Sequence, residues 1–218
     1  MADTAVTVQA LLAGKAMPFA RGEASAIAKQ PLNGPVKIGV LGIQGDEQAD
    51  PQHHGGPDKA LHHYPFDHYS WWRDEIGAHP LLAAPGAFGE NIAALGLTEE
   101  IVCIGDRFRL GTALIEISQG RQPCWKQGER LGSQAVVEQI ITSRRSGWYC
   151  RVIETGVAGA GGTLTLVERT QPDWSVARVF GLLIAGDHKS DRAALKALAG
   201  LEPLFAGWRE RAERLITS

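Results

Sequence analysis

The chain has 218 residues, of which 44% are hydrophobic and 21% are charged, so it can form one substantial hydrophobic core as an ordinary globular protein. Its formal net charge of −2 excludes the strongly basic surface that binds nucleic acid or an anionic membrane, and we expect neither partner. The three cysteines are too few for a disulfide framework, and the N-terminus has no basic start followed by an apolar run, so we expect a cytoplasmic protein without a signal peptide or membrane span.

The N-terminal part of the chain predicts short strands separated by turns. Residues 4–12 are rich in β-branched and apolar side chains, which predicts a first strand. Residues 21–35 contain prolines, glycines and an asparagine and predict a surface connection. Residues 36–43 predict a second strand, interrupted by Gly39 and Gly42. Because glycine marks bulges and barrel corners, this pattern favours a closed or strongly bent sheet.

Histidines cluster in the next segment. Five of the seven histidines of the protein lie in residues 53–68. Two prolines in the segment argue against a helix with regular histidine spacing, and no cysteine lies near, so we do not expect a zinc site. Gly55-Gly56 followed by Lys59 predicts either an ordinary turn or a turn whose N–H groups and cation hold a phosphate.

A helix and a polar pair follow. Residues 66–76 predict a helix whose Tyr69, Trp72 and Ile76 belong to the core. Glu90 and Asn91 then lie among glycines and apolar residues. A buried carboxylate needs a partner or a raised pKa, so this pair either belongs to a site or ties a loop together.

The middle of the chain alternates between strands and one helix. Residues 101–104 and 107–110 predict strands joined by a Gly-Asp turn. Residues 133–142 predict a helix, 148–154 fit a strand or a helix, and 163–169 predict a last strand.

Cys124 is the strongest candidate for chemistry. Apolar and polar residues alternate in residues 113–118, as in a strand with one buried face, and glycine and proline then end the strand. Cys124 should therefore lie in the loop at the strand end, where Arg121 and Lys126 favour the thiolate, which is both a nucleophile and a soft metal ligand. The alternative is a small buried hydrophobic side chain, the role we assign to Cys103 and Cys150.

The composition shifts after Pro172. Residues 174–185, 192–198 and 203–216 predict three helices. Their cations and anions nearly balance, so a packing or homo-oligomerisation module is favoured over a DNA-binding helix-turn-helix.

Three separated motifs together resemble one known family. They are His54-Gly55-Gly56-Pro57-Asp58-Lys59-Ala60, Gly89-Glu90-Asn91 and Gln119-Gly120-Arg121-Gln122-Pro123-Cys124-Trp125-Lys126. They resemble the MOSC family, named for the C-terminal domain of molybdenum cofactor sulfurases, and within it the YiiM-like bacterial group with a three-helix C-terminal domain. The family usually has proline where this chain has Gly120.

The resemblance implies an α+β, β-rich protein with a MOSC-type barrel-like domain at residues 1–171 and a three-helix domain at 172–218. It implies a molybdenum–pterin cofactor with Cys124 as the metal ligand, and makes Glu90, His54 and His62 candidate proton donors. The residues expected to bind the cofactor are His54, Gly55, Gly56, Lys59, His62, Glu90, Asn91, Gln119, Arg121 and Lys126.

The activity implied by the resemblance is reduction of N-hydroxylated compounds, such as hydroxylaminopurines, hydroxylamines and amidoximes, to the amine or amidine. The chain has no Gly-x-Gly-x-x-Gly after a strand, so we expect electrons from a separate reductase protein. The main alternative is a carrier that holds the cofactor, or sulfur on Cys124, for another enzyme. A cysteine hydrolase or transferase that uses His54 is a third possibility, and a DNA-binding regulator is a fourth.

Overall fold

The computed structural model describes residues 4–217, and its central feature is a closed β-barrel. The strand order around the barrel is β13, β9, β10, β11, β7, β8 and β1, and β1 pairs with β13 to close the ring. All neighbouring pairs are antiparallel except β7 with β8. The seven strands are β1 (Ala5–Ala13), β7 (Leu61–Pro65), β8 (Ile92–Ala94), β9 (Arg107–Leu110), β10 (Ala113–Gly120), β11 (Trp148–Glu154) and β13 (Thr163–Glu168). The expected β-rich α+β barrel is confirmed.

Smaller strands extend the barrel. The strand expected at 36–43 is instead a hairpin of β5 (Val36–Gly39) and β6 (Gly42–Ile43), and β12 (Gly156–Ala158) pairs with β5. Gly42 has a φ of 106°, which lets the chain reverse there, so the one-strand prediction is wrong. The connection expected at 21–35 contains β3 (Glu23–Ser25), which forms a hairpin with β2 (Met17–Ala20), and β4 (Gln30–Pro31), which pairs with β1.

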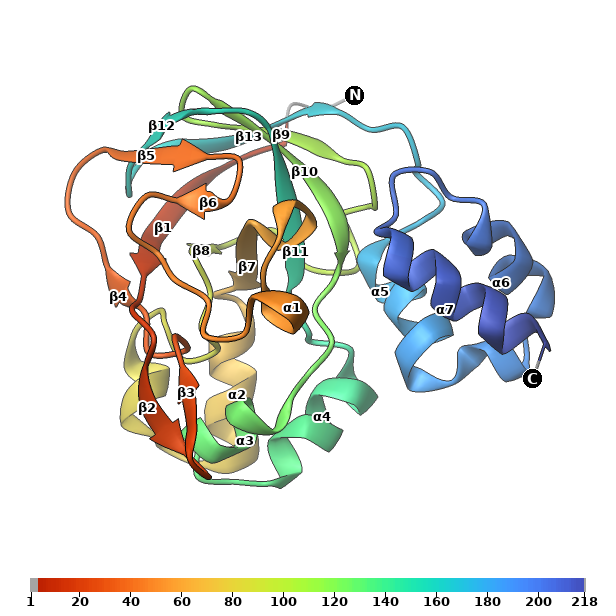
Figure 1. The fold of residues 1–218 in the computed structure, drawn as a ribbon, viewed down its shortest axis with the longest axis horizontal. Helices are drawn as coiled ribbons and strands as arrows, with labels where there is room; N and C mark the ends of the chain where they lie inside the picture. The colour runs from red at the N-terminus through yellow and green to blue at the C-terminus, as the bar shows by residue number, and fades with distance from the viewer. Residues whose placement is uncertain (1–3, 218) are drawn as a thin grey trace.

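Helices cover one end of the barrel (Figure 1). They are α2 (His68–Ile76), α3 (Trp125–Arg130) and α4 (Ala135–Ser143), while α1 (Pro51–His54) and the short 3₁₀ segments η1 (Pro57–Lys59) and η2 (Pro80–Ala83) lie in connections. Two of these, α2 and α4, confirm predicted helices, and the ambiguous segment at 148–154 is strand β11. Tyr69 and Trp72 are buried in the core, as expected.

The strand predicted at 101–104 is wrong. The backbone there turns, and its one bridge joins Cys103 to Ser175. The carboxylate of Asp106 accepts a hydrogen bond of 2.9 Å from the Cys103 N–H, and Ile104 N–H bonds to the carbonyl of Trp174. These bonds satisfy the backbone without a neighbouring barrel strand.

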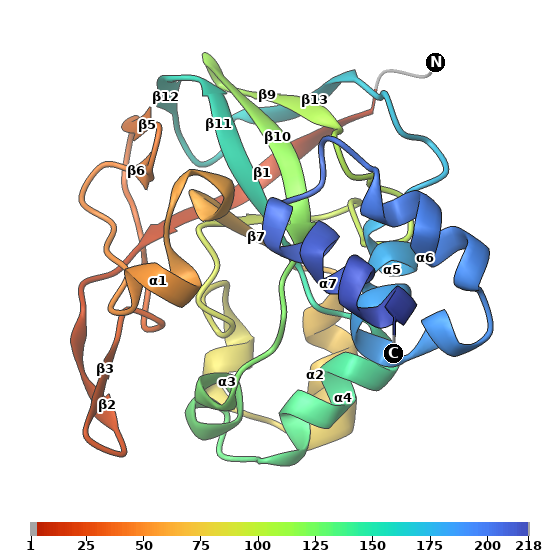
Figure 2. The same ribbon diagram turned by 45° about the vertical axis from the view of Figure 1, so that its right-hand side comes forward.

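The C-terminal helices lie beside β10 (Figures 1 and 2). They are α5 (Val176–Phe180), which continues into the π-helical turn η3 (Gly181–Ala185), then η4 (Asp187–Lys189), α6 (Arg192–Ala199) and α7 (Ala206–Thr217). One hydrophobic cluster contains Phe180, Leu195 and Trp208 together with barrel side chains such as Ile117. The division into two domains at residue 171 stays a prediction. Among residues 4–217, we find no helix with the length and apolar character needed to cross a membrane.

Candidate functional site

A cavity brings together residues from all three sequence motifs. Its wall includes residues 25–27 and Lys29, the loop after β6, the residue that follows β10 and the start of α3. Seven of the predicted site residues line it: His54, Lys59, His62, Asn91, Arg121, Cys124 and Lys126. The fold therefore brings together seven predicted residues that span 72 positions of the chain, from His54 to Lys126.

Cys124 lies between β10 and the first turn of α3. Its backbone N–H donates to Oε1 of Gln127 at 3.1 Å, an interaction that closes the helix start. Sequence reasoning missed this short helix, and the glutamine three positions after Cys124 was the available signal. Cys124 is partly exposed, whereas burial raises the pKa of both the Cys103 and the Cys150 thiols. Of the three cysteines, Cys124 is the one that lines the cavity.

Arg121 carries a buried charge with free donors. The residue is 6% exposed, and its Nε and Nη1 have no hydrogen-bond partner among the described residues. Burial disfavours the charged guanidinium, but the neighbouring Tyr149 and Cys124 raise the pKa of Arg121 overall. Buried N–H donors are normally paired, so this guanidinium is suited to an anionic ligand.

The two cavity histidines are neutral near pH 7. Burial and the nearby Arg121 lower the pKa of His54 to about 4. The same two causes lower the pKa of His62 well below its usual value. A neutral imidazole has one N–H donor and one acceptor nitrogen, so each ring can hydrogen-bond a ligand without adding a charge to the cavity.

Two lysines of the wall have fixed partners. Nζ of Lys126 donates to the carbonyl of Ala24 at 2.9 Å and lies 3.0 Å from the carboxylate of Glu23. Lys29, which the sequence analysis missed, pairs with Asp46 in a nearly buried ion pair, with Nζ 2.5 Å from Oδ2. Its signal was a lysine directly after a short apolar stretch, Ala26-Ile27-Ala28.

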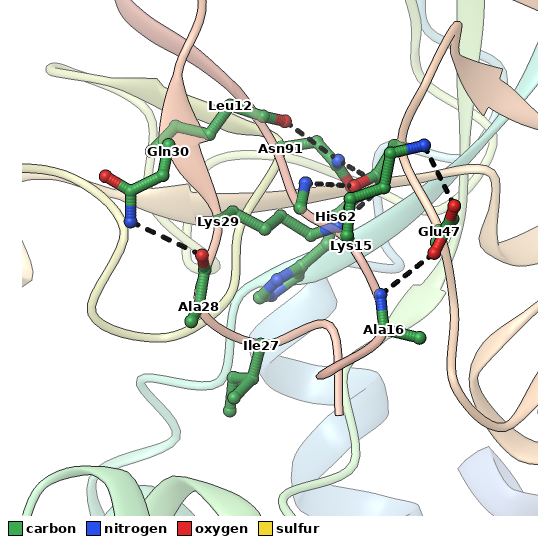
Figure 3. Close-up of polar contacts among 12 residues, drawn as sticks. Leu12, Lys15, Ala16, Ile27, Ala28, Lys29, Gln30, Glu47, His62 and Asn91 are labelled. Carbon is green, nitrogen blue, oxygen red and sulfur yellow. Dashed lines mark hydrogen bonds and ion pairs between the residues drawn. The ribbon is translucent and has the colours of Figure 1, made fainter. Parts of the chain in front are cut away.

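Asn91 joins three segments at the cavity wall (Figure 3). Its Nδ2 donates to the carbonyl of Leu12 at 3.1 Å and to Oδ2 of Asp46 at 2.8 Å, and its Oδ1 accepts the His62 N–H at 3.0 Å. Since the side-chain amide has two donors and these contacts use both, Asn91 holds β1, β7 and the Asp46 loop together.

The other predicted site residues are not among those that line the cavity. Glu90 is fully buried, and its carboxylate accepts hydrogen bonds from the N–H groups of Gly86 and Phe88 and from the Tyr69 hydroxyl, so it ties a loop together. Gln119 is buried, and its Nε2 lies 3.3 Å from the Gly120 carbonyl.

The Gly55-Gly56 turn follows α1 directly. Gly55 N–H donates to the Pro51 carbonyl at 3.2 Å, and Gly56 has a φ of 93° and accepts from the Lys59 N–H at 3.0 Å. The Gly55 amide is therefore engaged within the chain. The assignments of Gly55, Gly56, Glu90 and Gln119 to cofactor binding, and of Glu90 to proton donation, stay predictions.

Comparison with known proteins identifies the family. The MOSC domain model matches residues 50–165. Protein YiiM of Escherichia coli is 42% identical over 156 residues, which span 72% of this chain and 70% of that protein. A Gibberella moniliformis protein named "Reductase" is 42% identical over 156 residues, which span 71% of this chain but 28% of that much longer relative.

A solved structure agrees with this over nearly the whole chain. The crystal structure of YiiM from Geobacillus stearothermophilus matches with a TM-score of 0.81 and 33% identity, and the match covers 97% of this chain and 99% of that one. The chain belongs to the MOSC domain family.

Proposed function

We propose that this protein binds a molybdenum–pterin cofactor in the cavity, with the Cys124 sulfur on the metal, and reduces N-hydroxylated compounds. The observation that carries the proposal is the partly exposed Cys124 thiol in the same cavity as the Arg121 guanidinium, whose Nε and Nη1 have no hydrogen-bond partner among the described residues. A thiolate is a soft metal ligand, and buried unpaired N–H donors suit a phosphate, so these residues fit a group that carries both a metal and a phosphate.

The roles of the cavity residues follow from their chemistry. Arg121 and Lys59 would bind the phosphate of the cofactor, and Asn91 would hold the wall in shape. The cofactor supplies two-electron redox chemistry at its metal. Reduction of an N-hydroxyl group consumes two electrons and two protons and releases the amine and water. Of the candidate proton donors, His54 and His62 line the cavity, where burial and Arg121 favour the neutral form of both rings. The electrons would come from a separate reductase protein.

The name "Reductase" of the Gibberella moniliformis relative supports an oxidoreductase role, although this chain spans 28% of that protein. The name adds nothing about the substrate.

The test measures molybdenum and pterin in protein purified from a host that makes the cofactor. We expect both in the wild type and in Cys103→Ala, a control that removes a buried thiol, and loss of metal from a folded Cys124→Ser variant. Turnover of an aromatic hydroxylamine with an artificial reductant then separates a reductase from a cofactor carrier. Metal and pterin without turnover would support the carrier, and absence of both from the wild type would refute the proposal.

A further inference from the structure

The connection between α6 and α7 contacts the turn that carries Lys59. The ring of Phe205 lies 5.1 Å from Nζ of Lys59, within the range of a cation–π contact. The backbone N–H of Phe205 donates to the carbonyl of Ser118 at 2.9 Å, and the Ser118 hydroxyl donates to the carbonyl of Asp58 at 2.5 Å. The C-terminal helical segment thus contacts the Asp58-Lys59 turn directly, through the ring of Phe205, and indirectly, through hydrogen bonds to Ser118 of β10. Helix α7 lies beside this strand (Figure 2).

Arg151 makes a second connection between the same parts. Its Nε lies 2.6 Å from Oδ1 of Asp58, and its Nη1 donates to Oε1 of Glu116 at 2.6 Å and to the carbonyl of Pro203 at 3.0 Å. Pro203 lies two residues before Phe205 in the connection between α6 and α7. One guanidinium on β11 therefore links the Lys59 turn, the barrel wall and the C-terminal segment.

Lys59 is the member of this group that lines the cavity. Burial lowers the pKa of its ammonium group, and the carboxylates of Asp50 and Asp58 raise it. A lysine side chain has four rotatable bonds, and a half-buried ammonium group beside carboxylates has competing positions. The ring of Phe205 and the Asp58-Lys59 turn, which Arg151 and Ser118 hold in place, restrict those positions.

We propose that Phe205, together with Arg151, positions the Lys59 ammonium group at the cavity wall, so that the C-terminal helices take part in anion recognition there. The inference rests on the proposed function, in which Lys59 binds the phosphate of the cofactor. Phe205 and Arg151 are positioning residues in this account, because they act through Lys59.

The packing of the helical segment does not by itself require this contact. Trp208 packs against Gly120, and a Cβ at that glycine would lie 3.0 Å from the indole. Trp208 and Leu195 are buried, whereas Phe205 is only partly buried and has a cation beside its ring. Leucine at position 205 would keep an apolar side chain but remove the aromatic face, so Phe205→Leu separates positioning from packing.

The experiment uses the full chain with ¹³C-labelled lysine side chains, titrated with inorganic phosphate at low ionic strength. The Lys59 signal is assigned through Lys59→Met. We expect Phe205→Leu to move that signal, because the ring current of Phe205 is lost, and to weaken phosphate binding roughly two- to fivefold, the equivalent of a partly exposed cation–π contact. Phe205→Tyr should restore both the signal and the affinity.

Leu195→Ala is the control for packing. Leu195 is buried on α6, so this change should lower the melting temperature while the Lys59 signal and the phosphate affinity stay as in the wild type. An unchanged Lys59 signal and affinity in Phe205→Leu, or equal losses in Leu195→Ala, would overturn the inference. Wild-type phosphate affinity in Lys59→Met would instead refute the anion-binding role that the proposed function gives to Lys59.

Discussion

Replacing Asn91 with alanine should destabilise the fold strongly, because its side chain bonds three other segments. The change removes the acceptor of the His62 N–H, the donor to the Leu12 carbonyl and one donor to Asp46. A buried backbone group left without a partner costs about 1–3 kcal/mol, and a hydrogen bond to a charged group contributes about 1.5–3 kcal/mol. Asp46 keeps Lys29 and the Gly14 N–H, and water in the cavity can reach some of the freed groups, so we take the low end, about 4 kcal/mol.

Urea unfolding followed by tryptophan fluorescence measures this loss. A decrease of about 4 kcal/mol would be a large share of the 5–15 kcal/mol that typically stabilises a domain. Gln30→Ala is the control, because the Gln30 side chain is exposed and makes a long hydrogen bond of 3.4 Å to the Ala28 carbonyl. It should change the free energy of unfolding by less than about 0.5 kcal/mol.

A loss below about 1 kcal/mol in Asn91→Ala would refute the reasoning, since the freed backbone groups would then have found other partners. Asn91→Asp gives a second test. It keeps an acceptor for the His62 N–H but places a carboxylate against Asp46, so it should also lose stability at pH 7.

Two further changes test the core and the helical segment. Burial, followed by the charge of His68, lowers the pKa of His63 to about 3, so the unfolded chain takes up a proton on this ring near pH 6.5 and the folded chain does not. The free energy of unfolding is therefore unaffected by this ring above pH 6.5 and decreases as the pH falls towards 3. In urea unfolding, the free energy of unfolding of His63→Phe should decrease by about 2 kcal/mol less than that of the wild type between pH 7 and pH 5. Equal decreases in the two proteins would contradict this. Gly120→Ala places a Cβ 3.0 Å from Trp208, so it should cost about 1–2 kcal/mol by overpacking. A double-mutant cycle with Trp208→Leu should recover most of that loss, and strict additivity would show that the indole is not the obstacle.

Local patterns in the sequence predicted several elements and singled out a candidate site residue. Alternation in residues 113–118 predicted β10, and helical spacing in 133–142 predicted α4, because strands and helices repeat with different periods that short segments display. The sequence alone predicted that Cys124 is the cysteine with a chemical role, because glycine and proline end the strand before it and cations flank it. The three motifs together identified the family, which the comparisons confirmed.

The contacts that build the cavity depend on the tertiary structure. The pairing of β1 with β13 joins residues about 160 positions apart, such as Ala5 and Thr165, and no local pattern specifies that register. Closure brings Lys29 to the wall and pairs it with Asp46, while the Glu90 carboxylate ties a loop together, although its sequence context fitted either role. The contact of Phe205 with Lys59 likewise arises only when the C-terminal helices pack on β10. The sequence of a segment shows its periodicity and its turns, because both depend on neighbouring residues. A buried polar group must find a hydrogen-bond partner, and that partner comes from whichever distant segment the closed barrel places beside it.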